Sequence, residues 1–287
     1  MTPPPFVISI QSQVVFGHVG NSTALFPMQA AGLEVAAIPT VVFSNTPDYP
    51  TLRGRALPPE MFSDLLQGAR ERGLPERADY IVTGYIGSLD VAEMVADFLA
   101  EAKAANPRLR YLCDPVMGDE GPGLYVPEAI AGVMRDRLLP MADLATPNPF
   151  ELAWLTGQQI RTLADLQAAR AALHIAPAAH LIATGCVLDD TGPGQLETVL
   201  LGPEGVSRHP AVRLPIALPG TGDLFAGLLV AGLGRGLALP RAIETAQSLT
   251  ARALSHAKAL GAGEVVLSEP EFRRALLSLG QTGTGEG

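Results

Sequence analysis

The sequence predicts a three-layer αβα fold built around a mostly parallel central sheet. Apolar runs of strand length alternate with helical patterns over nearly the whole chain of 287 residues, and this alternation is typical of a parallel sheet covered by helices on both faces. Hydrophobic residues make up 47% of the chain, whereas aromatic residues make up only 5%. A core of Ala, Leu, Val and Gly suits the close packing of helices on such a sheet.

Residues that stop helices and strands separate the elements of the first half. Gly32 and Gly73 end helical patterns, Gly84 breaks an apolar run, and the pairs at 106–107 (Asn-Pro) and 114–115 (Asp-Pro) end a helix and a strand. The elements expected in this half are a strand at 6–10, a helix capped by Asn21 or Ser22 and ending near 31, a strand within 35–42, an exposed loop at 45–59, a helix at 60–72, a strand at 80–83, a helix at 89–104 and a strand at 110–113.

The second half continues the alternation and adds an antiparallel pair. Apolar segments near Val187 and at 197–201 are split by 189–194, whose Asp, Gly and Pro content is typical of a hairpin turn. The other elements expected are a helix at 127–138, a short strand near Leu144, a helix from 149 to Gly157, a helix at 163–173, a strand at 181–183, an extended segment at 206–214, and helices at 223–232 and 240–260.

The domain organisation follows from this pattern. No internal repeat or linker divides the chain, so residues 6–279 are expected to form a single domain. Residues 1–5 are proline-rich and are expected to be loose, and the Gly/Thr-rich residues 280–287 are expected to form a disordered tail.

Composition excludes several partners. The formal net charge is −9 and the sequence pI is about 5.0, so neither nucleic acid nor an anionic membrane is expected to bind. No apolar run approaches the roughly 20 residues of a membrane-spanning helix, and no signal peptide is recognisable, which predicts a cytoplasmic protein. Cys113 and Cys186 are too few for a disulfide framework and are interpreted as reduced thiols in the core.

Two common nucleotide-binding arrangements are missing from the sequence. Lys103 and Lys258 are the only lysines, and neither follows a glycine-rich loop, which excludes a P-loop and the lysine of protein kinases. After the first strand only Gly17 and Gly20 are present, which disfavours a dinucleotide-binding turn. Ligands of a parallel sheet bind beyond the carboxyl ends of its strands, so the residues after each strand are the ones of interest.

The segment Gly220-Thr221-Gly222-Asp223 opens a long apolar helix and is the most informative in the chain. Its backbone N–H groups are expected to converge at the helix N-terminus, where the helix dipole favours an anion. Asp223 would lie beside the same point, placed to take a proton from an attacking hydroxyl. On the local pattern alone, an ordinary Asp cap after a glycine turn remains an equal explanation.

Acidic residues follow two further strands. Asp114 and Asp119 come after the strand at 110–113, and Glu151 begins the helix after the strand near Leu144. Carboxylates at strand exits can hold Mg²⁺ directly or through water. A turn explains the first pair equally well, and a favourable acid in a first helical turn explains Glu151.

Three other residues carry weaker signals. Tyr85 follows a strand and could lie against a flat ligand or simply form part of the rim. Thr184 could bond a nucleotide or occupy a turn. His18 alone is more typical of a surface or core histidine than of a catalytic one.

Segments from residue 6 to residue 260 also match one family pattern in order. Ser-Ile-Gln-Ser at 9–12, Phe-Ser-Asn at 43–45 and Asp-Pro-Val-Met-Gly-Asp at 114–119 are the most specific, together with the Gly-x-Gly-Asp turn. With these segments the chain resembles the pyridoxal kinases of the ribokinase-like superfamily. The remaining matching segments are 17–21, 83–85, 106–107, 125–128 and 146–148 with Glu151.

The resemblance implies a role for each matched residue. Asp223 corresponds to the base that deprotonates the 5′-hydroxymethyl group of pyridoxal, and Gly220, Thr221 and Gly222 to an anion hole for the phosphoryl group. The implied metal-binding residues are Asp114, Asp119 and Glu151. The implied nucleotide contacts are Asp114, Thr146, Asn148, Glu151, Thr184, Thr221, Gly222 and, in a loop over the nucleotide, His209, Pro210, Ala211 and Val212. The implied substrate contacts are Ser12, Val19, Pro47, Tyr85 and Asp223.

The resemblance also implies ligands and an assembly. ATP is the expected co-substrate with Mg²⁺, a monovalent cation is left open, and a homodimer is expected. The chain departs from the family after Asn45, where the family usually has His-Thr-x-Tyr and this sequence has Thr46-Pro47-Asp48-Tyr49. A proline cannot donate a backbone hydrogen bond, so the contacts of this loop with the substrate are expected to differ from those usual in the family.

Other functions remain open at this point. A kinase of another hydroxymethyl heterocycle, such as hydroxymethylpyrimidine, is the near alternative, although that branch usually has a cysteine in the anion-hole turn. Sugar kinases of the fold are a further option. A non-catalytic protein that binds vitamin B6 would explain the altered loop at 46–47 but not the acids at 114, 151 and 223.

Overall fold

A nine-stranded sheet forms the centre of the computed structural model, which describes residues 3–279. The strand order is β11-β10-β9-β8-β5-β4-β1-β2-β3. These strands are β1 (Phe6–Phe16), β2 (Glu34–Asn45), β3 (Gly54–Ala56), β4 (Tyr80–Thr83), β5 (Arg110–Cys113), β8 (Leu144–Ala145), β9 (His180–Cys186), β10 (Gln195–Gly202) and β11 (Gly205–Val212).

The middle of the sheet is parallel and only its edges are antiparallel. β1 pairs in parallel with β2 and β4, and the parallel pairing continues from β4 through β5 and β8 to β9. β10 runs antiparallel to both β9 and β11, and β3 runs antiparallel to β2. The prediction of a mostly parallel sheet is confirmed. Its parallel strands therefore place their following residues at one common edge.

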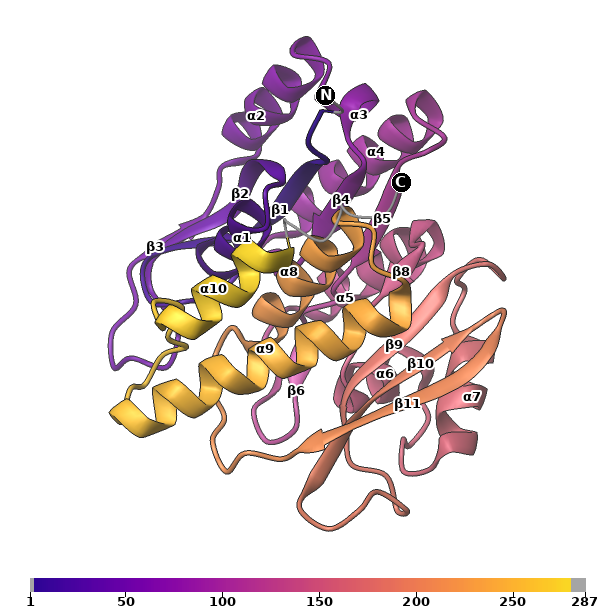
Figure 1. The fold of residues 1–287 in the computed structure, drawn as a ribbon. Helices are drawn as coiled ribbons and strands as arrows, with labels where there is room; N and C mark the ends of the chain where they lie inside the picture. The colour runs from indigo at the N-terminus through magenta and orange to yellow at the C-terminus, as the bar shows by residue number, and fades with distance from the viewer. Residues whose placement is uncertain (1–2, 280–287) are drawn as a thin grey trace, which may run out of the picture.

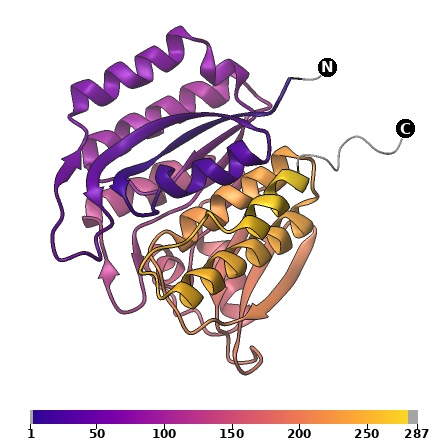
Figure 2. The same cartoon turned by 60° about the vertical axis from the view of Figure 1, so that its left-hand side comes forward.

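Helices cover both faces of this sheet, as Figures 1 and 2 show. One layer consists of α1 (Asn21–Ala30), α8 (Thr221–Gly234), α9 (Leu239–Leu260) and α10 (Pro270–Leu279). The other layer consists of α2 (Pro59–Glu71), α3 (Leu74–Arg77), α4 (Leu89–Ala105), α5 (Glu128–Val133), α6 (Pro149–Thr156) and α7 (Leu163–Ala172).

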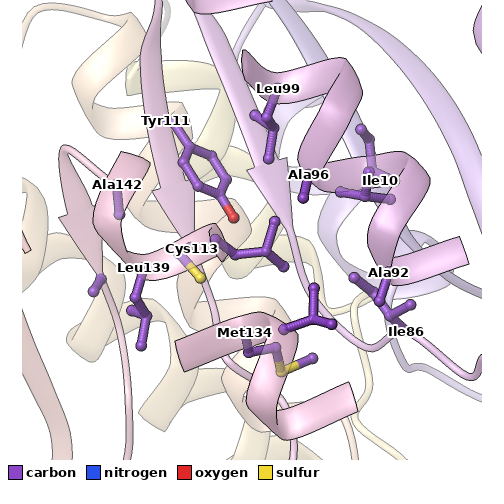
Figure 3. Close-up of a cluster of buried hydrophobic side chains, with 14 of the residues drawn as sticks. Ile10, Ile86, Ala92, Ala96, Leu99, Tyr111, Cys113, Met134, Leu139 and Ala142 are labelled. Carbon is purple, nitrogen blue, oxygen red and sulfur yellow. The ribbon is translucent and has the colours of Figure 1, made fainter. Parts of the chain in front are cut away.

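The strands are apolar on both sides because both sides are covered. On β5, Tyr111 and Cys113 point into the layer of α4, whereas Leu112 points into the layer of α8. Figure 3 shows Tyr111 and Cys113 beside Leu99 of α4 and Met134. Burying an aliphatic or aromatic side chain of this kind contributes about 1.5–3 kcal/mol. This two-sided burial explains why the strands read as continuous apolar runs rather than as alternating patterns.

The cysteines, the apolar helices and the chain ends bear on three further predictions. Cys113 and Cys186 are free and buried, as predicted. Within residues 3–279, no helix is long and apolar enough to span a membrane. Residues 3–5 have no regular secondary structure, whereas residues 1–2 and the predicted tail at 280–287 lie outside the described residues.

Some elements differ from the predictions. The loop expected at 45–59 contains the edge strand β3, and the first strand continues to Phe16 instead of ending at Ile10. Not predicted at all were α3, α10 and a small hairpin of β6 (Gly118–Asp119) and β7 (Gly123–Leu124). α3, β6 and β7 are four residues long or shorter, so local patterns indicate them poorly. α10 by contrast begins with Pro270 and Glu271 and is amphipathic, so its local pattern could have predicted it. The helix predicted at 127–138 is α5 followed by a wider π-type turn at Met134–Leu138.

The start of α1 also differs from the prediction. Neither Asn21 nor Ser22 caps this helix; its N-cap position is Gly20. The Asn21 side chain instead accepts a hydrogen bond from Ser9 Oγ (2.7 Å), and Ser22 Oγ accepts one from the Val14 amide (3.1 Å). Both side chains are therefore used to tie the helix start to β1.

Candidate active site

The glycine turn before α8 packs directly on the segment that follows β1. Gly220 has a φ of 77°, and a Cβ built on it would overlap the carbonyl oxygen of His18. Only glycine fits this position, because the backbone is left-handed and another chain segment touches it. The first amides of α8 have no partner inside the helix. Those of Thr221, Gly222 and Asp223 are therefore oriented toward whatever occupies the helix N-terminus.

Asp223 is buried at this turn, with 7% of its surface exposed. Burial raises the pKa of its carboxyl group, and a hydrogen bond from the Gly20 backbone opposes this increase. Among the residues that the structure describes, none gives Asp223 Oδ1 a hydrogen bond. A buried polar atom without a partner is costly. This oxygen is therefore suited to a ligand, as a general base requires.

Asp114 lies at the end of β5 and faces the same turn. A Cβ built on Gly222 would lie 3.9 Å from Asp114 Oδ2. Asp114 Oδ1 accepts a hydrogen bond from Thr146 Oγ1 (2.9 Å), while Oδ2 finds no partner within residues 3–279. Burial and then the charge of Asp223 raise the pKa of Asp114 to about 8. Two buried carboxylates, 109 residues apart in the chain (223 − 114), thus point unpaired oxygens into one site.

Glu151 lies near this pair, but its carboxylate accepts hydrogen bonds from nearby backbone amides. Its Oε1 accepts a hydrogen bond from the Met117 amide (3.1 Å), and its Oε2 accepts one from the Asn148 amide (2.8 Å). Asn148 Oδ1 in turn accepts from the Glu151 amide (2.8 Å), which completes a capping box at the start of α6. Burial and the charge of Asp114 raise the pKa of Glu151 well above its ordinary value.

The three residues predicted to bind metal do not form a direct ligand set. In the described part of the chain, no three His, Cys, Asp or Glu side chains are arranged to hold a metal ion. Asp119 is exposed and its Oδ1 accepts from the Glu120 amide (2.7 Å), and both Glu151 oxygens are occupied. The unpaired oxygens of Asp114 and Asp223 nevertheless suit a hard cation such as Mg²⁺, which takes few protein carboxylates and keeps several waters.

Two of the predicted substrate residues, Ser12 and Val19, contact the glycine turns of this site. Ser12 is buried in β1, and a Cβ built on Gly20 would overlap its hydroxyl oxygen, so Ser12 is a neighbour of Gly20, whose backbone hydrogen-bonds Asp223. Val19 is half-buried in the same segment. Tyr85 is half-buried just after β4, whereas Pro47 is exposed beyond β2.

The predicted nucleotide residues are spread over several strands, and one of them contacts Asp114. Thr146 contacts Asp114 directly, and Thr184 in β9 donates its backbone N–H to the Pro147 carbonyl (3.0 Å). Residues His209, Pro210, Ala211 and Val212 belong to the strand β11, which confirms the extended segment predicted at 206–214 and corrects the loop that the resemblance implied for this segment. Their pairing with residues 195–198 of β10 fixes the backbone as an edge strand. Their nucleotide contacts stay a prediction.

One buried acid near the site was not predicted. Glu264 is 8% exposed and accepts hydrogen bonds from Thr46 Oγ1 (2.6 Å) and from the His18 amide (3.0 Å). It follows α9 in a segment without regular secondary structure. No motif surrounds it, so only tertiary structure identifies it.

Comparison with known proteins assigns the chain to a family. Residues 34–268 match the family model described as phosphomethylpyrimidine kinase. A pyridoxal kinase of Rubrobacter xylanophilus is 40% identical over 246 residues, covering 85% of this chain and 83% of that protein. A pyridoxal kinase of Deinococcus radiodurans is 36% identical over 281 residues, covering 95% and 94%. The chain belongs to the pyridoxal kinase branch of the phosphomethylpyrimidine kinase family.

Solved structures of this family share the fold and carry relevant ligands. The pyridoxal kinase of Leishmania donovani in complex with ADP and pyridoxamine superimposes with a TM-score of 0.84 at 30% identity, covering 94% of this chain and 95% of that chain. The same kinase with ADP and pyridoxine also gives a TM-score of 0.84, at 31% identity and with 94% of each chain covered. The predicted ribokinase-like fold and family are both confirmed.

Proposed function

We propose that this protein transfers the γ-phosphoryl group of ATP to the 5′-hydroxymethyl group of pyridoxal and of other B6 vitamers. The observation that carries the proposal is the buried pair of Asp114 and Asp223, whose unpaired oxygens meet at the N-terminus of α8. The relatives named as pyridoxal kinases and the kinase structures bound to ADP and B6 vitamers support the same substrates.

Asp223 acts as the general base in this proposal. Its carboxylate accepts the proton of the vitamer's hydroxyl group as that oxygen attacks the terminal phosphorus of ATP. Because burial raises the pKa of Asp223, the carboxylate is a stronger proton acceptor than an exposed aspartate. The Gly20 backbone hydrogen bond limits the increase and orients the carboxylate.

The turn at Gly220 supplies the electrostatic part of the reaction. Phosphoryl transfer depends mainly on positioning and on stabilising charge at the transferring group. The amides of Thr221 and Gly222 and the dipole of α8 stabilise the phosphoryl oxygens. The left-handed Gly220, pressed against the His18 carbonyl, keeps those amides in place.

A magnesium ion belongs beside Asp114 in this proposal. Asp114 Oδ2, which has no hydrogen-bond partner within residues 3–279, would hold it, and Asp119 and Glu151 are the other acids that we assign to the metal. Bound Mg²⁺ neutralises charge on the ATP phosphates. A cation at this point also relieves the repulsion between Asp114 and Asp223 that contributes to the raised pKa of Asp114. Whether a monovalent cation assists is decided by comparing activity in K⁺ and in Na⁺.

The vitamer lies on the side of Ser12, Val19 and Tyr85. Ser12 offers a hydroxyl group to the ring, while Val19 and Tyr85 flank its faces. Pro47, which replaces the threonine usual in the family, contributes only an apolar contact. On the nucleotide side we assign Thr146, Asn148, Thr184 and the strand residues 209–212.

The proposal also covers the domain organisation, the location and the assembly. We propose one domain over residues 6–279, a cytoplasmic location and a homodimer. Exposed apolar residues at the end of β1, Val15 (83% exposed) and Phe16 (59% exposed), support a protein-covered surface there.

A panel of acceptors tests the proposed function. ADP release is measured with ATP, Mg²⁺ and each of pyridoxal, pyridoxine, hydroxymethylpyrimidine and ribose. We expect pyridoxal to give the highest kcat/KM and ribose none. Faster turnover of hydroxymethylpyrimidine would instead support the alternative of a kinase for another hydroxymethyl heterocycle. Tight pyridoxal binding without ATP consumption would indicate a non-catalytic binding protein.

A further inference from the structure

Glu264 connects two loops that are far apart in the sequence. Its Oε1 accepts from the hydroxyl group of Thr46, 218 residues away, and its Oε2 accepts from the amide of His18, 246 residues away. A Cβ built on Gly17 would lie 2.6 Å from Oε1, so the chain passes too close for a side chain. The carboxylate is buried against both loops.

The aromatic ring of Tyr49 completes this contact. Partial burial and then the charge of Glu264 raise the pKa of its phenol. The Tyr49 ring also packs edge-on against Phe16, with ring centroids 5.6 Å apart. The loop at 46–49, which follows β2, is therefore attached to the segment at 16–20, which follows β1, through Glu264 and this ring pair.

Both of these loops belong to the substrate side of the proposed site. The segment at 17–20 provides the His18 carbonyl that packs on Gly220 and the Gly20 backbone hydrogen bond to Asp223. The loop at 46–49 contains Pro47, the assigned substrate contact. Thr46 is fully buried and donates its hydroxyl proton to Glu264. That proton is consequently unavailable to a substrate.

We propose that Glu264 is a positioning residue that fixes the loops at 17–20 and 46–49 relative to each other and thereby sets the affinity for the B6 vitamer. The inference rests on the proposed function. It also gives a physical reason for Thr46 at a position where the family usually has histidine. The Thr46 hydroxyl attaches the loop at 46–49 to Glu264. Neither loop includes an assigned nucleotide residue, and the segment at 17–20 reaches the nucleotide side only through the His18 carbonyl that packs on Gly220. We therefore expect vitamer binding to change more than ATP binding.

A purely structural role for Glu264 would give a different result. Glu264 would then only attach the segment between α9 and α10 to the body of the protein. Its loss would lower the melting temperature without separating the two substrates. A positioning role instead changes KM for the vitamer and leaves KM for ATP unchanged. This difference, and not stability, distinguishes the two roles.

Two substitutions, their double variant and one control form the test. Glu264→Gln keeps the shape but removes the charge; its oxygen can still accept from the His18 amide, whereas its NH2 group obliges the Thr46 hydroxyl to accept instead of donate. Thr46→Val removes the hydroxyl donor and keeps the volume, and the double variant reports coupling between them. Glu101→Gln on α4 is the control, because Glu101 forms an exposed ion pair with Arg70. For each variant, kcat, KM for pyridoxal, KM for ATP and the melting temperature are measured.

We expect Glu264→Gln to raise KM for pyridoxal about tenfold, as for a lost hydrogen bond to a charged group, with KM for ATP within about twofold. Thr46→Val should raise it less, and the double variant should be no worse than Glu264→Gln. Equal changes in both KM values, or no change in either, would overturn the inference. If Glu264→Gln does not fold, Thr46→Val decides by the same criteria. An inactive wild-type protein would refute the proposed function instead.

Discussion

At the scale of single residues, the site depends on two carboxylates that the fold deprives of water. Asp114 and Asp223 come from different elements, and each has one buried oxygen without a hydrogen bond in the described chain. Their proximity makes ionising both unfavourable, so burial and mutual repulsion raise the pKa of Asp114 to about 8. Such a pair is expected where a cation and a phosphoryl group bind between the two acids.

The raised pKa makes the stability of the ligand-free protein depend on pH. An aspartate with its ordinary pKa of 3.8 loses its proton in the unfolded chain near pH 4, whereas folded Asp114 keeps it to about pH 8. Between these values the folded protein binds the additional proton, so Asp114 makes stability fall as pH rises from about 4 to about 8. Above pH 8 its contribution is constant.

Replacing Asp114 tests this titration. We expect Asp114→Asn to flatten the fall in the free energy of unfolding between pH 5 and pH 8 by a few kcal/mol, since one pKa unit corresponds to about 1.4 kcal/mol. Urea unfolding at several pH values, without Mg²⁺, measures it. Asp64→Asn, at an exposed position on α2, is the matched control. An unchanged pH slope in Asp114→Asn would show that Asp114 titrates normally.

At the scale of elements, the N-terminus of α8 is built by a turn and not by a capping side chain. No side chain caps this helix, and its N-cap is the left-handed Gly220. Thr221 Oγ1 donates to the Leu218 carbonyl (2.8 Å), which closes the turn before the helix. The free amides are thus left for a ligand. By contrast, the capping box of α6 forms hydrogen bonds with backbone amides at the N-terminus of that helix.

Gly220→Ala should damage both stability and activity. The new methyl group would overlap the His18 carbonyl in a backbone conformation that alanine avoids, so we expect a loss of about 2–3 kcal/mol and a fall in kcat of about tenfold or more. Gly157→Ala is the control, because Gly157 is also left-handed (φ 69°) but has open space around it. It should cost about 1 kcal/mol and leave kcat unchanged. Equal effects of both variants would contradict the role given to the turn.

The sequence predicted these elements unevenly. Strands and helices with strong apolar patterns, such as β4, β5, α4 and α9, were predicted within one or two residues. The edge strand β3 was not predicted, because it is three residues long and exists only through pairing with β2. The side-chain contacts of Asn21 and Ser22 at the start of α1 also depend on residues of β1 that are distant in sequence.

At the scale of the whole molecule, the parallel sheet brings together residues that local patterns left ambiguous. On sequence grounds Asp114 could belong to a turn and Asp223 could be a simple cap. Because β1 and β5 are parallel strands of one sheet and α8 packs on α1, the structure places Asp114 and Asp223 side by side and Ser12 in contact with Gly20. The sequence could predict that strand exits meet, since that follows from topology.

At this scale the sequence could not predict which acidic side chains remain free to bind a ligand or a metal ion. Glu151 looked like a metal ligand but uses both oxygens for backbone amides, and Asp119 is exposed. Glu264 had no motif and is nevertheless the acid that joins the loops at 17–20 and 46–49. Whether a carboxylate is free for a ligand depends on its hydrogen bonds to residues distant in sequence, and only the folded chain reveals these bonds.

The central claim is that Asp223 removes a proton from the vitamer at the site where Asp114 and the Gly220 turn meet. Its most direct test is single-turnover phosphorylation of pyridoxal by Asp223→Asn, with ATP and pyridoxal binding measured separately. We expect the rate to fall by about 10²–10⁴, while both ligands bind within about threefold of wild type and the melting temperature does not fall. A variant that phosphorylates pyridoxal at the wild-type rate would contradict the claim.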